Sequence, residues 1–155
     1  MKSPWVITSL ILYNSDFKML LQHRTDDAPV NPSYWSFFGG CSKNGESLIQ
    51  TFSRKLDEDL SVHLSFFEYY TAQTYLLDPR GPRTRHFFIA PTDCSPQTLR
   101  SHQREGQDLA FLSSNDLKKR KHRYVDLCIV KMLEKDLKAG KPLLQKEYVP
   151  LRFNT

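Results

Sequence analysis

Hydrophobic residues recur every fourth position between residues 47 and 60, which is the clearest periodic signal in the chain. The apolar positions of this segment are Leu48, Phe52, Leu56 and Leu60. On an α-helix they form one stripe, so a helix over residues 47–60 is predicted to pack on a sheet. Ser47 followed by Gln50 is typical of a capping box at the helix start. A second amphipathic helix is predicted over residues 123–137, where an Ala-Gly-Lys-Pro sequence ends it.

The remaining apolar runs are short and rich in β-branched or aromatic residues, which is typical of strands. Strands are predicted at residues 5–14, 19–24, 34–40 (ending on two glycines), 62–77 (with a break), 84–91 and 108–113. Residues 78–83 read as a hairpin turn, and residues 114–119 as one helical turn. Strands alternating with helices predict an α/β fold in which helices cover a mixed sheet. The tail, residues 140–155, has no clear pattern.

Composition favours one folded domain over residues 1–155. The chain is 39% hydrophobic and 25% charged, which is ordinary for a globular protein. The three cysteines form no Cys-x-x-Cys pair, so we expect a reducing, cytoplasmic location. No apolar run approaches the length of about 20 residues that a membrane span needs, and no membrane partner is expected. The net charge of +5 favours anionic partners.

Candidate chemistry gathers in residues 39–62, GGCSKNGESLIQTFSRKLDEDLSV. The glycines allow a tight bend that exposes carbonyl oxygens, and Glu46 lies just before the predicted helix. Arg54 and Glu58 lie one helical turn apart, as do Lys55 and Asp59, so these four side chains are expected to form a charged ridge opposite the apolar stripe. Oxygen ligands of this kind suit Mg²⁺ or Mn²⁺.

This segment resembles the Nudix (MutT-type) signature, and the resemblance extends over most of the chain. The matching positions are Gly40, Glu46, Arg54, Leu56, Glu58 and Val62. Three positions depart from the signature: Lys55 and Asp59 stand where it has glutamates, and Ser61 where it has glycine. At Ser61 the helix is expected to end without a left-handed glycine. The resemblance implies a Nudix-type α/β/α sandwich with a central mixed sheet.

The resemblance also implies an activity and a set of roles. Members of the family hydrolyse a diphosphate linked to another group, commonly a nucleoside, with Mg²⁺ or Mn²⁺. The implied metal ligands are the Gly39 carbonyl, Glu58, Asp59 and Glu105. Arg54, Glu58 and Glu105 are the implied catalytic residues. Gly40 and Glu46 are implied to shape the loop. From its place after a strand, Arg24 is a candidate for substrate contact, and a nucleotide-like small molecule is the expected partner.

Lys55 leaves three arrangements open. In the first, its side chain points away and Glu58, Asp59 and Glu105 hold one metal in a slow hydrolase. In the second, the ammonium occupies a metal position and contacts a substrate phosphate, so that binding survives and turnover falls. In the third, the domain is catalytically inactive and binds a nucleotide or a protein. A metal-dependent pyrophosphohydrolase impaired by Lys55 is the favoured function.

A basic segment, LKKRKHRY, precedes the second long helix. It could contact nucleic acid, a membrane surface or polyphosphate, but a solvated helix start is the simpler interpretation of residues 118–123. No aromatic signature of RNA binding accompanies it in the sequence. Homodimerisation stays open as well.

Overall fold

The computed structural model describes residues 5–76, 81–141 and 151–153. Within these residues seven strands form one sheet, in which β1 (Trp5–Tyr13) runs parallel to β7 (Arg83–Pro91) and every other pairing is antiparallel. The central path is β3-β2-β1-β7-β6, with β4 on β1 and β8 on β2. The other strands of this sheet are β2 (Met19–His23), β3 (Trp35–Ser36), β4 (Phe38–Cys41), β6 (Glu68–Tyr75) and β8 (Asp108–Leu112). The predicted mixed sheet is confirmed.

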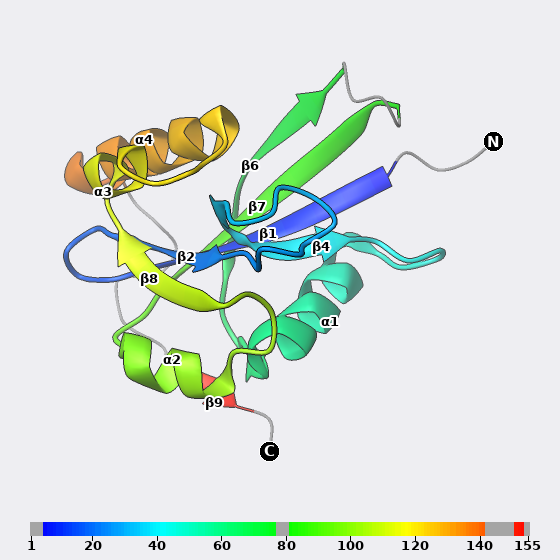
Figure 1. The fold of residues 1–155 in the computed structure, drawn as a ribbon, viewed down its shortest axis with the longest axis horizontal. Helices are drawn as coiled ribbons and strands as arrows, with labels where there is room; N and C mark the ends of the chain where they lie inside the picture. The colour runs from blue at the N-terminus through cyan, green and yellow to red at the C-terminus, as the bar shows by residue number, and fades with distance from the viewer. Residues whose placement is uncertain (1–4, 77–80, 142–150, 154–155) are drawn as a thin grey trace.

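Helices cover both faces of this sheet (Figure 1). On one face α3 (Ser114–Lys118) and α4 (Tyr124–Lys138) enclose a core that includes Phe87 and Val130. On the other face α1 (Leu48–Leu60) and α2 (Pro96–His102) enclose a second core, where Phe52 packs against Phe88. Side chains alternate between the two faces along each strand, so one sheet supplies both cores. The α/β/α arrangement is therefore confirmed.

Helix α1 forms because its two ends are capped within the chain. Ser47 accepts a hydrogen bond from the Gln50 amide, and the Gln50 side chain accepts one from the Ser47 amide, as the capping box predicts. Ser61 ends the helix in a left-handed conformation with φ 53°, and its amide donates to the Leu56 and Asp57 carbonyls. The helix thus ends without a left-handed glycine, as expected, and Ser61 itself takes the conformation that glycine adopts more easily.

The predicted elements need correction at three points: the aromatic strand, the position of the two glycines and one helix. The single aromatic strand at residues 34–40 is divided into β3 and β4, which pair with different neighbours, β2 and β1. The glycines lie inside β4 rather than at its end, because the strand continues to Cys41. Helix α2 was missed, although Ser95 caps it and Pro96 occupies its first position. That Ser-Pro pair is a helix-start signal.

The chain between α1 and β7 contains the predicted break. A short strand, β5 (Val62–His63), is separated from β6, and it pairs with β9 (Arg152–Phe153) near the end of the chain. The Phe153 ring also stacks on His102 of α2, at 3.9 Å between ring centroids. Half of the predicted turn at residues 78–83 and most of the tail at residues 140–155 lie outside the described residues.

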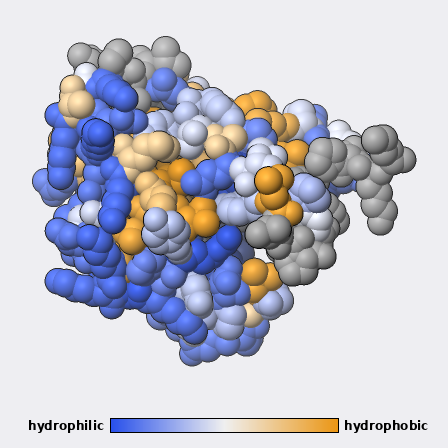
Figure 2. Space-filling model, turned by 90° about the horizontal axis from the view of Figure 1, so that it is seen from above, coloured by the Kyte–Doolittle hydropathy of each residue, from blue (hydrophilic) through white to orange (hydrophobic). Residues whose placement is uncertain are grey.

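The surface and the cysteines add two observations. The face seen in Figure 2 is largely hydrophilic around a group of exposed apolar atoms. No helix among the described residues is long and apolar enough to cross a membrane. Cys41, Cys94 and Cys128 are all free thiols.

Candidate functional site

The glycine pair on β4 lets two other parts of the chain approach its backbone closely. A Cβ atom at Gly40 would lie 2.6 Å from Cε of Lys55, so only glycine leaves room for that side chain. A Cβ atom at Gly39 would lie 1.9 Å from the Thr8 carbonyl oxygen, and Gly39 has φ +152°. The two glycines therefore allow two different close approaches, one to the neighbouring strand and one to the helix.

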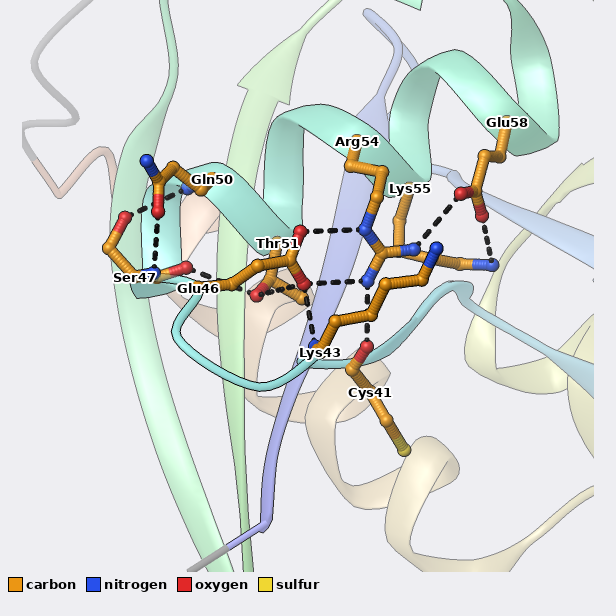
Figure 3. Close-up of polar contacts among 9 residues, drawn as sticks. All are labelled: Cys41, Lys43, Glu46, Ser47, Gln50, Thr51, Arg54, Lys55 and Glu58. Atoms are coloured by element: carbon orange, nitrogen blue, oxygen red, sulfur yellow. Dashed lines mark hydrogen bonds and ion pairs between the residues drawn. The ribbon is translucent and has the colours of Figure 1, made fainter. Parts of the chain in front are cut away.

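Arg54 connects the loop before α1 with the helix itself (Figure 3). Its Nε and Nη2 atoms donate to the two carboxylate oxygens of Glu46 at 2.7 and 2.9 Å, and Nη2 also donates to the Cys41 carbonyl at 2.9 Å. Its Nη1 atom donates to Glu58 Oε1 at 3.0 Å. These hydrogen bonds hold the pKa of Glu46 at about 2 and lower the pKa of Glu58. Both carboxylates therefore stay ionised, as charge-assisted pairs require.

Glu46 also braces the loop that it belongs to. Its Oε1 atom accepts a hydrogen bond from the Lys43 amide at 2.6 Å and one from the Thr51 hydroxyl at 3.3 Å. Arg54 thus rigidifies residues 41–46 from one side and orients Glu58 from the other.

Lys55 points into the site rather than away from it. Its Nζ atom lies 3.1 Å from Oδ1 of Asp59 and 3.4 Å from Oε2 of Glu58, above Gly40. The Lys55 side chain is only 16% exposed, and the whole of Asp59 is 3% exposed. The charged ridge expected opposite the apolar stripe is therefore only partly right. Glu58 is exposed and Asp59 is buried, while Arg54 and Lys55 are both half-buried.

Glu105 reaches the same place from the loop between α2 and β8. The amides of Arg104 and Glu105 donate to the Asp59 carbonyl at 2.8 and 3.4 Å, so the loop is fastened to the end of α1. The amide side chain of Gln22, on β2, donates to Glu105 Oε2 at 3.3 Å. Gln22 was missed from the sequence. Residues two apart on a strand share a face, so Gln22 lies on the same buried face of β2 as Leu20. A polar side chain at a buried position is a signal that the sequence offers.

The Asp59 carboxylate is electrostatically strained. Burial and, after it, the Glu105 charge raise its pKa to about 7, against the opposing effect of the Lys55 ammonium. One of its oxygens, Oδ2, is buried without a hydrogen-bond partner. The single Lys55 ammonium faces two carboxylates here, Asp59 and Glu105, so the site favours an additional cation or a proton at Asp59.

Whether these residues fit a divalent ion depends on Lys55. The oxygens of Glu58, Asp59, Glu105 and the Gly39 carbonyl are hard donors suited to Mg²⁺ or Mn²⁺, and the unpartnered oxygen of Asp59 is consistent with a missing cation. Among the described residues, however, no three His, Cys, Asp or Glu side chains are gathered closely enough to hold a metal. The ammonium already stands between Glu58 and Asp59. The donor chemistry therefore fits a divalent ion once the Lys55 side chain has moved aside.

Arg24 lies outside this set of contacts. Its Nε atom donates to the Val30 carbonyl at 2.9 Å, and its own carbonyl accepts from the Gln107 side chain at 2.8 Å. In this conformation Arg24 braces the loop that follows β2 and touches the Glu105 loop from outside. Its contact with a substrate stays a prediction.

The geometry and the comparisons with known proteins lead to the same family. The NUDIX domain model matches residues 4–133, which is most of the chain. This chain therefore belongs to the Nudix family, whose hydrolases generally use divalent metal ions. A search of curated proteins gave no match.

Solved structures of Nudix proteins share the fold at low sequence identity. The NUDIX domain of Shewanella oneidensis NrtR, solved with ADP ribose, aligns with a TM-score of 0.67 at 20% identity, covering 88% of this chain and 90% of its own. A MutT structure from work on Aliivibrio salmonicida and Vibrio cholerae aligns at 0.64 with 24% identity, covering 86% and 99%. The Escherichia coli ORF135 protein aligns at 0.65 with 20% identity, covering 90% and 94%. At these identities the likeness shows the fold alone.

Proposed function

We propose that this Nudix protein binds the diphosphate of a nucleoside di- or triphosphate derivative above Gly40 and hydrolyses it slowly. The observation that carries the proposal is the place of the Lys55 ammonium, 3.1 Å from Asp59 and directly over Gly40. An ammonium offers three N–H donors and a positive charge, both of which suit phosphate oxygens. Lys55 is thus assigned to substrate binding, the second of the three arrangements that the sequence left open.

Slow turnover follows from the same position. A divalent ion and an ammonium 4 Å apart repel each other by about 8 kcal/mol at an effective dielectric constant near 20. The metal, Mg²⁺ or Mn²⁺, therefore competes with Lys55 for Asp59 and Glu58. Where it binds, the Gly39 carbonyl, Glu58, Asp59 and Glu105 hold it, and it supplies charge neutralisation at the phosphate oxygens and an activated water.

The chain's own residues do the remaining work. Arg54 keeps Glu58 oriented and Glu46 in the loop, so it is a positioning residue. Gln22 and the amides that bind the Asp59 carbonyl hold Glu105 beside Asp59. Residues 41–46 keep their shape through Glu46, beside the Gly40 backbone over which the Lys55 side chain lies.

The proposal is tested by replacing Lys55. Wild type, Lys55→Glu and Lys55→Met are compared for hydrolysis of nucleoside triphosphates and ADP-ribose with Mg²⁺ or Mn²⁺. Lys55→Glu is expected to raise kcat/KM by about 100-fold, the order by which one charged group in a reaction site alters catalysis. Lys55→Met removes the ammonium without adding a metal ligand. It should therefore weaken binding of the same compounds in the absence of metal, and it should raise turnover less than Lys55→Glu does. Loss of all activity in Lys55→Glu, with no ligand bound by wild type, would refute the proposal.

A second candidate function is a binding domain without turnover. It is favoured by the ion pairs of Arg54 and Lys55, which already neutralise Glu46, Glu58 and Asp59. Nucleotide binding by wild type, combined with no hydrolysis by wild type or Lys55→Glu, supports this candidate. The cytoplasmic location and homodimerisation stay predictions from the sequence.

A further inference from the structure

The segment that joins α3 to α4, yellow in Figure 1, carries the chain's unbalanced positive charge. Five of residues 118–123 are Lys or Arg and the sixth is His122, and those five charges equal the whole formal excess of +5. Among the described residues, no carboxylate lies within ion-pairing distance of any of them. The carboxylates nearby in sequence have other partners: Asp116 pairs with Lys18, and Asp126 with Arg85.

The segment is held in a defined shape against β3. The Trp35 amide donates to the Lys121 carbonyl at 2.8 Å, and Trp35 forms a β-bridge with His122. The Arg120 side chain donates to the Asp116 carbonyl at 2.9 Å, and its own carbonyl lies 2.7 Å from Nδ1 of His122. These contacts fix the backbone of the segment, while Lys118, Lys119 and Lys121 remain exposed to solvent.

Aromatic rings from other parts of the chain lie under the cations. Arg120 lies over Trp35 at 5.2 Å, Lys121 over Tyr34 at 4.8 Å and Arg123 over Tyr75 at 5.6 Å. Tyr124, which follows the segment, is 76% exposed. The sequence shows no aromatic signature beside the basic residues because these rings come from β3, from the residue before β3 and from β6. We call residues 118–123 with Tyr34, Trp35, Tyr75 and Tyr124 the basic–aromatic surface.

We propose that the basic–aromatic surface binds single-stranded nucleic acid. Positive charges that track a phosphate backbone, interleaved with rings on which bases stack, are the two features by which proteins bind single strands without reading sequence. The exposed lysines contact phosphates, and Tyr124 offers a ring to a base. An exposed cation–ring contact is weaker than base–aromatic stacking. Arg123 and Lys121 can therefore turn to phosphates and free Tyr75 and Tyr34 for bases.

A single strand fits this surface better than a duplex does. Duplex recognition needs a helix or ribbon that enters a groove, and flat rings gain nothing from bases that are already stacked. The rings here lie under cations that can turn to phosphates, which leaves the rings to unpaired bases. This binding is independent of the diphosphate site, because it uses none of the residues around Gly40.

The test measures binding of a labelled single strand of about 12 nucleotides, within the usual site sizes, to the full chain. A 5′-hydroxyl end keeps the strand from offering a terminal phosphate to the Lys55 site. Binding through Lys118, Lys119 and Lys121 predicts a slope of about −2 for log K against log salt concentration. The triple change of these three lysines to Gln should lower affinity by about 100-fold near 0.1 M salt. Tyr124→Ala should lower it by at least about fivefold through lost stacking.

The matched control changes Lys131, Lys135 and Lys138 to Gln. These exposed lysines of α4 lie at least seven residues beyond Tyr124 along the helix, so the net charge falls by the same amount away from residues 118–123. The control should change affinity by less than twofold, with thermal unfolding confirming that every variant is folded. Equal losses in both triple variants, equal affinity for a duplex, or preferred binding to vesicles of anionic lipid would each overturn the proposal.

Discussion

Replacing Asp59 by asparagine should stabilise the protein at pH 8 and leave its stability unchanged at pH 4. Asp59 is the buried end of the candidate site, with Glu105 beside it and one oxygen without a partner. Asparagine has nearly the same shape and cannot ionise. The substitution therefore removes a negative charge whose burial beside Glu105 destabilises the folded state. It keeps the packing between α1 and the Glu105 loop.

The magnitude follows from the proton affinity of Asp59. Its pKa is raised from 3.8 to about 7, first by burial and then by Glu105. The folded state thus binds the proton more tightly than the unfolded chain does, and stability falls as pH rises from about 4 to 7. Each factor of ten in proton affinity is worth about 1.4 kcal/mol, so an ionised Asp59 costs up to about 4 kcal/mol above pH 7. We expect Asp59→Asn to recover about 2 to 4 kcal/mol there.

The assay is urea unfolding of wild type and Asp59→Asn at pH 4, 6 and 8, in a chelator so that no metal contributes. Glu58→Gln is the control of opposite sign, because hydrogen bonds from Arg54 lower the Glu58 pKa in the folded state. That variant should be slightly less stable at pH 8, by up to about 1 kcal/mol for an exposed pair. Equal stability of Asp59→Asn and wild type at pH 8, or a gain of the same size at pH 4, would show that Asp59 is not strained.

Three further predictions concern the surroundings of the site. Gly39→Ala should cost more than about 3 kcal/mol in unfolding free energy, because its Cβ would collide with strand backbone. Gly40→Ala meets only the flexible end of a lysine and should cost less than about 1.5 kcal/mol; equal costs would contradict this. Arg54→Ala should lower kcat of the proposed reaction by about 10- to 100-fold and speed proteolysis of the loop held by Glu46, whereas unchanged cleavage would exclude the bracing role. Phe153→Ala removes a ring stacked on α2 and should lower stability by about 1 to 3 kcal/mol in thermal unfolding, and an unchanged Tm would exclude that contribution.

Local features of the site were readable from the sequence because they depend on neighbours in the chain. The capping box, the stripe of α1 and the spacing of Glu46, Arg54 and Glu58 are set by helical periodicity. The family followed from the same spacing, and the match over residues 4–133 confirms it. The missed α2 carried a local signal too, the Ser95–Pro96 pair.

What the sequence alone determined is the family, the mixed sheet between helices, and the local order of charged residues on α1. Tertiary structure decided which of those charges are buried, because Asp59 meets Glu105, and Glu105 meets Gln22, only when α1, the Glu105 loop and β2 converge. It also decided that Lys55 turns inward, since Gly40 removes the side chain that would have blocked it. The rings beneath residues 118–123 were invisible for the same reason. Burial, pKa and stacking are set by distances between segments remote in the chain, and no local pattern encodes those distances.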